Sequence, residues 1–118
     1  MNLFKYHNNP EKLDGFENRI TNIPELAYQH ARELGKPFPE GEKAIAKDTH
    51  FSYLYAYYIL KGRFKLGETI ISENSFWSFK YVIEVTKGRF ELGESVIFAD
   101  SVLKYQYLKL LKEKGIEI

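Results

Sequence analysis

Two nearly identical segments, KGRFKLGE and KGRFELGE, contain the side chains of this chain that could bind a phosphate group. Each places an arginine, Arg63 or Arg89, beside a glycine, and two such guanidinium groups could form a ladder for an anion. The favoured interpretation is structural, because Glu68 or Glu94 follows each arginine closely enough to pair with it, or the arginine stacks on a ring. The segments also lack the Lys-Ser/Thr ending of a nucleotide-binding P-loop.

The histidines do not form a metal-binding pattern. His7, His30 and His50 share no short spacing that would place ligands on one helical face. We expect His30 to replace an aromatic framework residue, and we expect His50 to be exposed in the first turn of a helix. Because the chain also has no cysteine, the sequence predicts no metal site and no cofactor.

Acidic and hydroxyl side chains show no catalytic pattern either. General acid–base catalysis by two carboxyl groups requires neighbouring acids in unlike environments. The serine-rich segment SENSFWS has no histidine and aspartate placed to activate a hydroxyl. The acidic pairs are Glu40 with Glu42 and Glu91 with Glu94, and both are expected to be solvated. The chain is therefore predicted not to be an enzyme.

Length and charge restrict the remaining classes of function. The 118 residues suit one domain, and 17 basic against 16 acidic residues leave a net charge of +1. This balance gives no support to a dedicated nucleic-acid binder. No segment resembles a signal peptide or reaches the roughly 20 apolar residues of a membrane span. We expect a soluble, cytoplasmic protein whose aromatic residues, 16% of the chain, fill a core or coat a surface.

The two arginine segments belong to a longer repeat with a period of 26 residues. Such a period is typical of stacked repeat proteins, in which one unit cannot bury its apolar face alone. The positions that agree between copies are therefore expected to form the framework of the stack. They are Phe38, Phe64 and Phe90; Gly41, Gly67 and Gly93; Glu42, Glu68 and Glu94; Ile45, Ile71 and Ile97; and Tyr55, Tyr81 and Tyr107.

One copy predicts two helices and a tight connector. Asp48 is an expected N-cap, and apolar residues then recur at helical spacing in Phe51, Tyr55 and Ile59. Gly62 is the expected left-handed residue that ends this helix. A second, shorter helix is expected to begin at Glu68. The residues expected to anchor the turn between the two helices are Phe64 and Leu66, and Gly67 is expected to permit a sharp bend.

These patterns predict an all-α fold, a short solenoid of three to four two-helix repeats with terminal caps. The expected parts are an N-terminal cap of loop and short helix (1–21), repeats at 22–47, 48–73 and 74–99, and a C-terminal capping helix (100–118). In the first repeat, Leu26 and His30 match Phe51 and Tyr55 only if one residue is dropped near Leu34. The helix of that repeat is therefore expected to end differently.

Positions that differ between copies are free to contact a partner. The helix that contains YLYAYYIL is unusually apolar outside its core stripe, and tyrosine is an efficient interface residue. The alternative interpretation is that these side chains pack against the adjacent helix or the N-terminal cap. The candidate partner-binding residues are Leu54, Tyr57, Tyr58, Phe76, Lys80 and Ile83.

Nucleic-acid binding is the alternative class of function. The C-terminal third of the chain is more basic than the rest, and the many aromatic side chains could stack on bases. The candidate contacts for this alternative are Arg63, Arg89, Lys104, Lys109 and Lys112.

The repeats resemble a helical repeat of uncharacterised proteins from tailed bacteriophages. The segments KGRFKLGETI, KGRFELGESV, PEGEKAIAKD and PELAYQHA follow the pattern ELAYxYAxxVLKGRFPEGExxIAKD over about residues 22 to 112. The first copy lacks KGR, and the later copies have Lys65 or Glu91 in place of the proline. The resemblance implies a phage-encoded binding module in the cytoplasm of the infected bacterium. Its expected partner is a host protein that it inhibits or redirects, such as a defence complex of the CRISPR nuclease type.

Overall fold

The computed structural model describes residues 10–118, and the side chains from residue 15 onward. The all-α prediction is confirmed for these residues, which form helices and connecting turns without a β-strand. No helix in the described range combines the length and the apolar character that a membrane span requires. The expected N-terminal cap falls partly on residues 1–9, which lie outside the described range.

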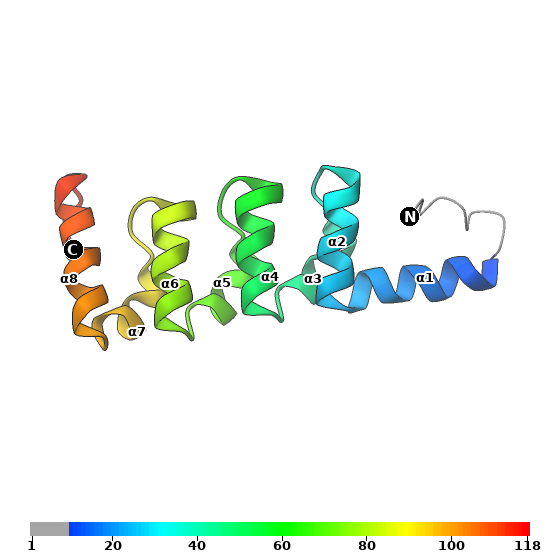
Figure 1. Ribbon diagram of the computed structural model, residues 1–118, viewed down its shortest axis with the longest axis horizontal. Coiled ribbons are helices and arrows are strands. Elements are labelled where there is room, and N and C mark those ends of the chain that lie inside the picture. The colour runs from blue at the N-terminus through cyan, green and yellow to red at the C-terminus, as the bar shows by residue number, and fades with distance from the viewer. Residues whose placement is uncertain (1–9) are drawn as a thin grey trace.

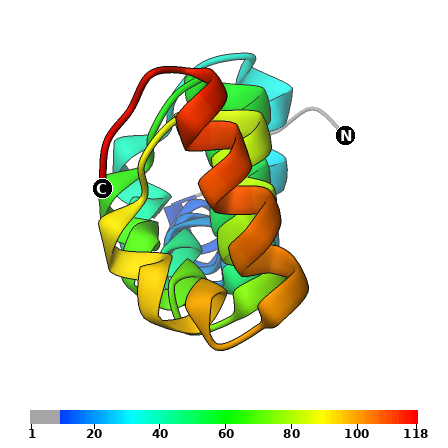
Figure 2. The same cartoon turned by 90° about the vertical axis from the view of Figure 1, so that its left-hand side faces the viewer.

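Four long helical segments stand side by side in one row (Figure 1). Shorter helices and extended connectors join them and form a second layer, which is separate from the row in the end-on view of Figure 2. The long segments are α2 (Pro24–Leu34), α4 with η3 (Thr49–Leu54, Tyr55–Leu60), α6 with η4 (Ser75–Tyr81, Val82–Thr86) and α8 (Ser101–Glu113). The short ones are η2 with α3 (Pro39–Gly41, Glu42–Ile45), α5 (Lys65–Ile71), and η5 with α7 (Glu91–Gly93, Glu94–Phe98).

The row makes an elongated molecule of 56 × 22 × 18 Å. Its radius of gyration is 17.1 Å, whereas a compact domain of this length would have about 13.5 Å. The core therefore runs along the row between the two layers. Framework positions at the 26-residue spacing lie in it with almost no exposure: Ile45, Ile71 and Ile97; Phe64 and Phe90; Tyr55, Tyr81 and Tyr107.

The predicted N-cap Asp48 is confirmed, and the residues at its position in the next two copies cap their helices in the same way. The side chain of Asp48 accepts a hydrogen bond from the Phe51 N–H at 2.8 Å, and Asn74 accepts one from the Trp77 N–H at 2.9 Å. Asp100 does the same at the start of α8. Each cap satisfies an amide that the first turn of a helix leaves without a partner.

The long helix ends near Lys61 as expected, but the predicted left-handed residue is wrong by one position. Lys61 adopts the left-handed conformation with φ of 52°, and Lys87 repeats it with φ of 51°, whereas Gly62 does not have a positive φ. The reason is that the helix changes to a π-helical segment before it ends, with the Lys87 N–H bonded to the Val82 oxygen at 2.7 Å. The lysine that closes this π turn is the left-handed residue, and the glycine comes after it.

The π segment also explains why the first repeat appeared to lack one residue. In α2, which stays α-helical, the left-handed Gly35 follows the N-cap position Ile23 by 12 residues. In the next copy the left-handed Lys61 follows the N-cap Asp48 by 13 residues. A π turn accommodates one additional residue within the long helix. The expected difference in the ending of the first helix is confirmed.

One predicted turn anchor is also wrong. Phe64 is buried, but Leu66 is 56% exposed, and Leu92 at the same position of the next copy is 57% exposed. Both side chains point away from the core because the backbone turns into a short helix at this position, which directs only one of the two apolar residues inward.

Helix α1 (Pro10–Asn22) occupies the N-terminal end of the row, as Figure 1 shows. It has 13 residues, so it is longer than the short helix expected there. It packs against α2 and α3, and its Ile20 side chain is buried. The end of the apolar row is therefore covered on this side.

The framework glycines are required by close packing. A Cβ atom on Gly67 would lie 2.6 Å from the Ser52 hydroxyl oxygen and 2.7 Å from a ring carbon of Phe64. A Cβ on Gly62 would meet nothing closer than the Leu60 carbonyl oxygen at 3.9 Å. Gly67 therefore lets a short helix lie directly on the preceding long helix, and it has no left-handed backbone that would need glycine for a bend.

We expect Gly67→Ala to lower the free energy of unfolding by about 1–3 kcal/mol, because the added methyl group overfills the contact. Gly62→Ala is the matched control, with an expected change between zero and a gain of about 1 kcal/mol. Urea unfolding of both variants measures this difference. Equal stability of the two variants would contradict the packing.

Candidate functional site

The two arginines that could have formed an anion-binding ladder are each engaged by a glutamate. Arg63 Nε donates to Glu68 Oε2 at 2.8 Å, and its NH2 group donates to Glu68 Oε1 at 2.9 Å. Arg89 makes the same two bonds to Glu94 at 2.8 and 3.2 Å. Such two-point pairing confirms the structural interpretation of the arginines. These guanidinium groups are not free to hold a phosphate.

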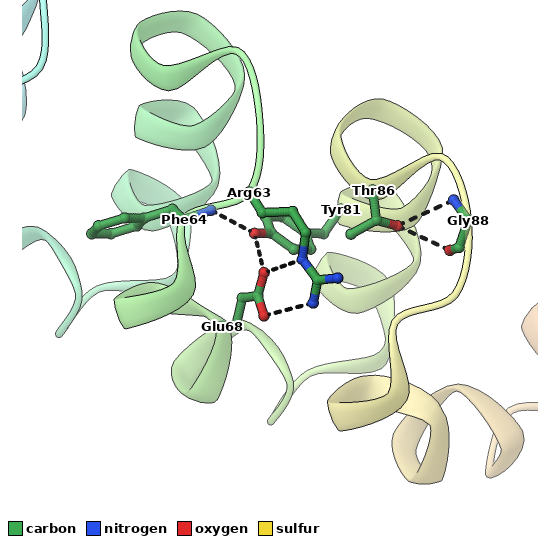
Figure 3. Close-up of polar contacts among 6 residues, drawn as sticks. All are labelled: Arg63, Phe64, Glu68, Tyr81, Thr86 and Gly88. Carbon is green, nitrogen blue, oxygen red and sulfur yellow. Dashed lines mark hydrogen bonds and ion pairs between the residues drawn. The ribbon is translucent and has the colours of Figure 1, made fainter.

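Each glutamate also binds the tyrosine of the following long helix, as Figure 3 shows for the central copy. The Tyr81 hydroxyl donates to Glu68 Oε2 at 2.7 Å and accepts the Phe64 N–H at 2.9 Å. The hydroxyl thus connects a connector amide, a short-helix carboxylate and the next long helix at one buried point.

Burial and hydrogen bonding shift the pKa values of this network in opposite directions. Burial acts to raise the pKa of the Glu68 carboxyl, but the hydrogen bonds from Arg63 and Tyr81 outweigh it and lower that pKa below its usual range. Burial raises the pKa of the Tyr81 hydroxyl, and the bond to the Glu68 carboxylate adds to this effect. The glutamate is therefore ionised and the tyrosine neutral around pH 7.

The same tyrosine network occurs three times, with one variation. Tyr55 bonds to Glu42 and the Phe38 N–H, and Tyr107 bonds to Glu94 and the Phe90 N–H. Proline at position 37 replaces the arginine in the first copy, so Glu42 has the tyrosine as its partner and no arginine there. Because this network recurs in all three copies and its polar atoms bond to one another, we assign it a structural role.

Sequence reasoning placed the framework tyrosines in the core stripe but missed the role of their hydroxyl groups. The signal was present, because the copies keep tyrosine at 55, 81 and 107 while the preceding stripe position varies as Phe51, Trp77 and Leu103. It also missed Ser52 and Ser78, whose buried hydroxyls donate to the carbonyl oxygens of Ile45 and Ile71.

The histidines and acidic pairs do not come together in a reactive arrangement. His30 packs edge-on against Phe38 with ring centroids 4.5 Å apart, as Tyr55 does against Phe64 at 4.9 Å, so its framework role is confirmed. His50 is exposed, as expected. His7 lies outside the described residues. Within residues 10–118 there is no group of three or more acidic or histidine side chains that could hold a metal ion.

Exposed aromatic side chains form the most distinctive surface. Tyr57, Tyr58 and Phe76 are 38%, 51% and 58% exposed, which confirms the expected exposure of these three candidates. Buried Tyr53 and half-buried Trp77 lie beneath them. We call these five residues the aromatic strip.

The rings of the aromatic strip form one connected series across two long helices. Tyr58 meets Tyr57 edge-on at 4.7 Å, and Tyr57 lies parallel to Tyr53 at 5.9 Å. Tyr53 contacts Trp77 at 5.5 Å, and Trp77 contacts Phe76 at 5.2 Å. The contacts hold the exposed rings in defined positions, so little conformational freedom remains for a partner to remove.

Two cations cover rings of the aromatic strip. Lys80 Nζ lies 5.5 Å from the Tyr53 ring centroid, and the Arg32 guanidinium carbon lies 5.5 Å from that of Tyr58. Lys80 thereby joins the candidates that the structure brings together. Ile83 is 39% exposed, one turn beyond Lys80 on the same helix. Leu54 packs against the core and is half-buried, which favours the structural interpretation for this residue.

Of the residues proposed for nucleic-acid contacts, only the lysines are without a glutamate partner in the described part of the chain. Lys104, Lys109 and Lys112 are exposed on α8, and Lys104 Nζ lies 5.7 Å from the Phe98 ring centroid. Since Arg63 and Arg89 are held by their glutamates, a phosphate-binding surface would depend on the lysines of α8 alone.

Comparison with known proteins gives no match. No protein-family model, no curated protein and no solved structure matches the chain.

We expect Tyr81→Phe to lower the free energy of unfolding by about 1–3 kcal/mol, because the buried Phe64 N–H loses its acceptor and Glu68 loses a donor. Thermal and urea unfolding measure the change. Tyr105→Phe is the control, since Tyr105 is 66% exposed and its substitution should change stability little. A neutral Tyr81→Phe would show that the hydroxyl does not hold the connector.

Acid should weaken the fold through Glu68 and Glu94, whose pKa values are lowered in the folded chain. A carboxyl group with a lowered folded pKa stabilises the fold above its ordinary value, 4.5 here, and this contribution disappears as pH falls through the folded pKa. We therefore expect Glu68→Gln to be less stable than the natural chain at pH 7. The difference in the free energy of unfolding between the two chains should narrow below about pH 4. Urea unfolding across pH tests this, and a difference that does not depend on pH would contradict it.

Proposed function

We propose that the chain is a short solenoid of three to four two-helix repeats that works as a protein-binding module. Recurrence of the glutamate–tyrosine–amide network at the 26-residue spacing supports the repeat architecture. Because the framework positions use their polar atoms internally, binding is left to the positions that differ between copies. A row of stacked units offers these positions as an extended surface.

The single observation that carries the proposal is the aromatic strip. Its exposed members Tyr57, Tyr58 and Phe76 lie on two neighbouring long helices and are held by ring contacts from beneath. Large aromatic side chains are enriched among the residues that contribute most to protein–protein binding. A connected apolar patch of this kind marks an interaction surface more often than scattered exposed residues do.

A protein partner fits this surface better than a nucleic acid. The rings of the strip already contact one another and two cations, and Glu84 lies close enough to raise the pKa of Tyr53 together with burial, the larger cause. A carboxylate at this place repels phosphate groups. The arginines proposed for nucleic-acid binding are paired with glutamates.

The resemblance to tailed-phage repeat proteins suggests the biological setting. In this proposal the partner is a host protein in the cytoplasm of an infected bacterium. Binding inhibits or redirects that protein, for which a defence complex of the CRISPR nuclease type is an example. The proposed activity is binding alone and involves no catalytic step.

The test is binding of a purified host partner, identified by affinity capture and mass spectrometry, to the double variant Tyr57→Ser/Tyr58→Ser. We expect the dissociation constant to rise at least about tenfold, because each tyrosine contributes as a large interface side chain. The melting temperature should change little, since both side chains are exposed.

Tyr105→Ser is the matched control, because Tyr105 is a 66% exposed tyrosine on α8, which contributes no residue to the strip. It should bind the partner as the natural chain does. Unchanged affinity of the double variant, with its fold intact, would show that the strip is the wrong surface. An equal loss in both variants would indicate a general effect of surface aromatic residues.

A further inference from the structure

A hollow with a strongly basic lining lies at one end of the aromatic strip. It has a volume of about 350 Å³ and lies between the C-terminal ends of α2 and η3. Its lining includes Arg32, Lys36, Ile59 and Lys61. Tyr58 belongs both to this basic hollow and to the strip, so the two features form one continuous surface.

The cations of the basic hollow have no acidic partner in the described part of the chain. Arg32, Lys36 and Lys61 are all exposed, and no ion pair joins any of them to a carboxylate there. Arg63 and Arg89, in contrast, are each held by a glutamate. The fold thus neutralises the arginines of its framework and leaves three positive charges together at this place.

Helix ends do not cancel this charge. The C-terminus of a helix has a partial charge of about −0.5, so the ends of α2 and η3 contribute about −1 together. Three full positive charges exceed this sum by about two units. The basic hollow therefore attracts anions, although lysines near a helix C-terminus also stabilise that helix.

The next pair of copies has a different residue at the position of Tyr58. Lys87 occupies the place of Lys61 and has the same left-handed backbone, but Glu84 occupies the place of Tyr58. A carboxylate is thus built into the third copy where the second has a tyrosine. The gathering of three cations without a nearby carboxylate in the lining is therefore a property of the first two copies and not of the repeat itself.

We propose that the basic hollow binds carboxylate side chains of an acidic peptide segment whose apolar residues lie along the aromatic strip. This inference rests on the proposed protein-binding function and names the chemistry of the partner. Glutamate or aspartate side chains pair with Arg32, Lys36 and Lys61, and the Arg32–Tyr58 contact joins the charged end of the site to its aromatic part.

The distribution of charge favours an acidic peptide over a nucleic-acid strand. A strand presents phosphates at regular intervals and is held by cations along its whole path. Here three cations gather at one end, and farther along the strip Lys80 is accompanied by Glu84. This pattern matches a ligand with localised acidic residues followed by apolar ones.

The test uses two synthetic peptides and the full chain. The acidic probe is acetyl-Glu-Glu-Glu-Tyr-Leu-Tyr-amide, and its neutral counterpart has glutamine at the three glutamate positions. Amide NMR titration follows Gly35, Lys36 and Lys61 at the hollow. We expect the acidic peptide to bind about tenfold more tightly at low salt, because three exposed ion pairs each contribute modestly. The preference should shrink at about 0.3 M salt.

The variant Arg32→Gln/Lys36→Gln/Lys61→Asn removes the three charges, with asparagine chosen because it tolerates the left-handed conformation. We expect it to bind both peptides equally. The matched control, Lys87→Asn/Lys109→Gln/Lys112→Gln, loses the same charge and one left-handed lysine but should keep the tenfold preference.

Three results would overturn the inference. They are equal affinity of the natural chain for both peptides, loss of the preference in the control variant, and tighter binding of a thymidine hexanucleotide than of the acidic peptide at the same amides. The proposed function is tested separately. If Tyr57→Ser/Tyr58→Ser weakens capture of the host partner while the charge variant does not, the strip is the interface and its partner is not acidic at this end.

Discussion

The structure depends on one tyrosine hydroxyl group per copy. In the central copy the Tyr81 hydroxyl accepts the Phe64 amide and donates to the Glu68 carboxylate, so a side chain from one long helix satisfies groups in the preceding connector and short helix. A buried amide and a buried carboxylate without partners would each cost free energy. Each copy is therefore completed by a residue of the next copy, which makes neighbouring copies interdependent.

This dependence accounts for the other framework residues. The hydroxyl reaches the carboxylate only if the short helix lies directly on the long helix, and Gly67 allows that approach where a Cβ would meet Ser52. Ser52 in turn donates to the Ile45 carbonyl oxygen, and Arg63 holds the carboxylate from the solvent side. Glycine and glutamate thus recur in all three copies, and serine and arginine in two of them, because they serve one geometric arrangement.

The sequence predicted the parts of this arrangement that local chemistry determines. N-caps, the apolar stripe and the Arg63–Glu68 pair follow from spacing within a few residues. The left-handed Lys61 was not predicted, because its position depends on the π segment that ends the helix. The exposure of Leu66 was not predicted, because it depends on the short helix that begins at Lys65. The π segment accommodates an additional residue, and the apolar spacing within one copy does not distinguish it from a continuous α-helix.

The exposed face could be predicted only in part for a related reason. Differences between copies correctly indicated that Tyr57, Tyr58 and Phe76 are free of the framework, but not that Leu54 packs into the core. Connection of the exposed rings through Tyr53 and Trp77 requires side chains from two helices to meet in space. Since identical copies would present identical surfaces, a specific site on such a row arises only where neighbouring copies differ. The strip lies at such a place, where Tyr58 in one copy is followed by Glu84 in the next.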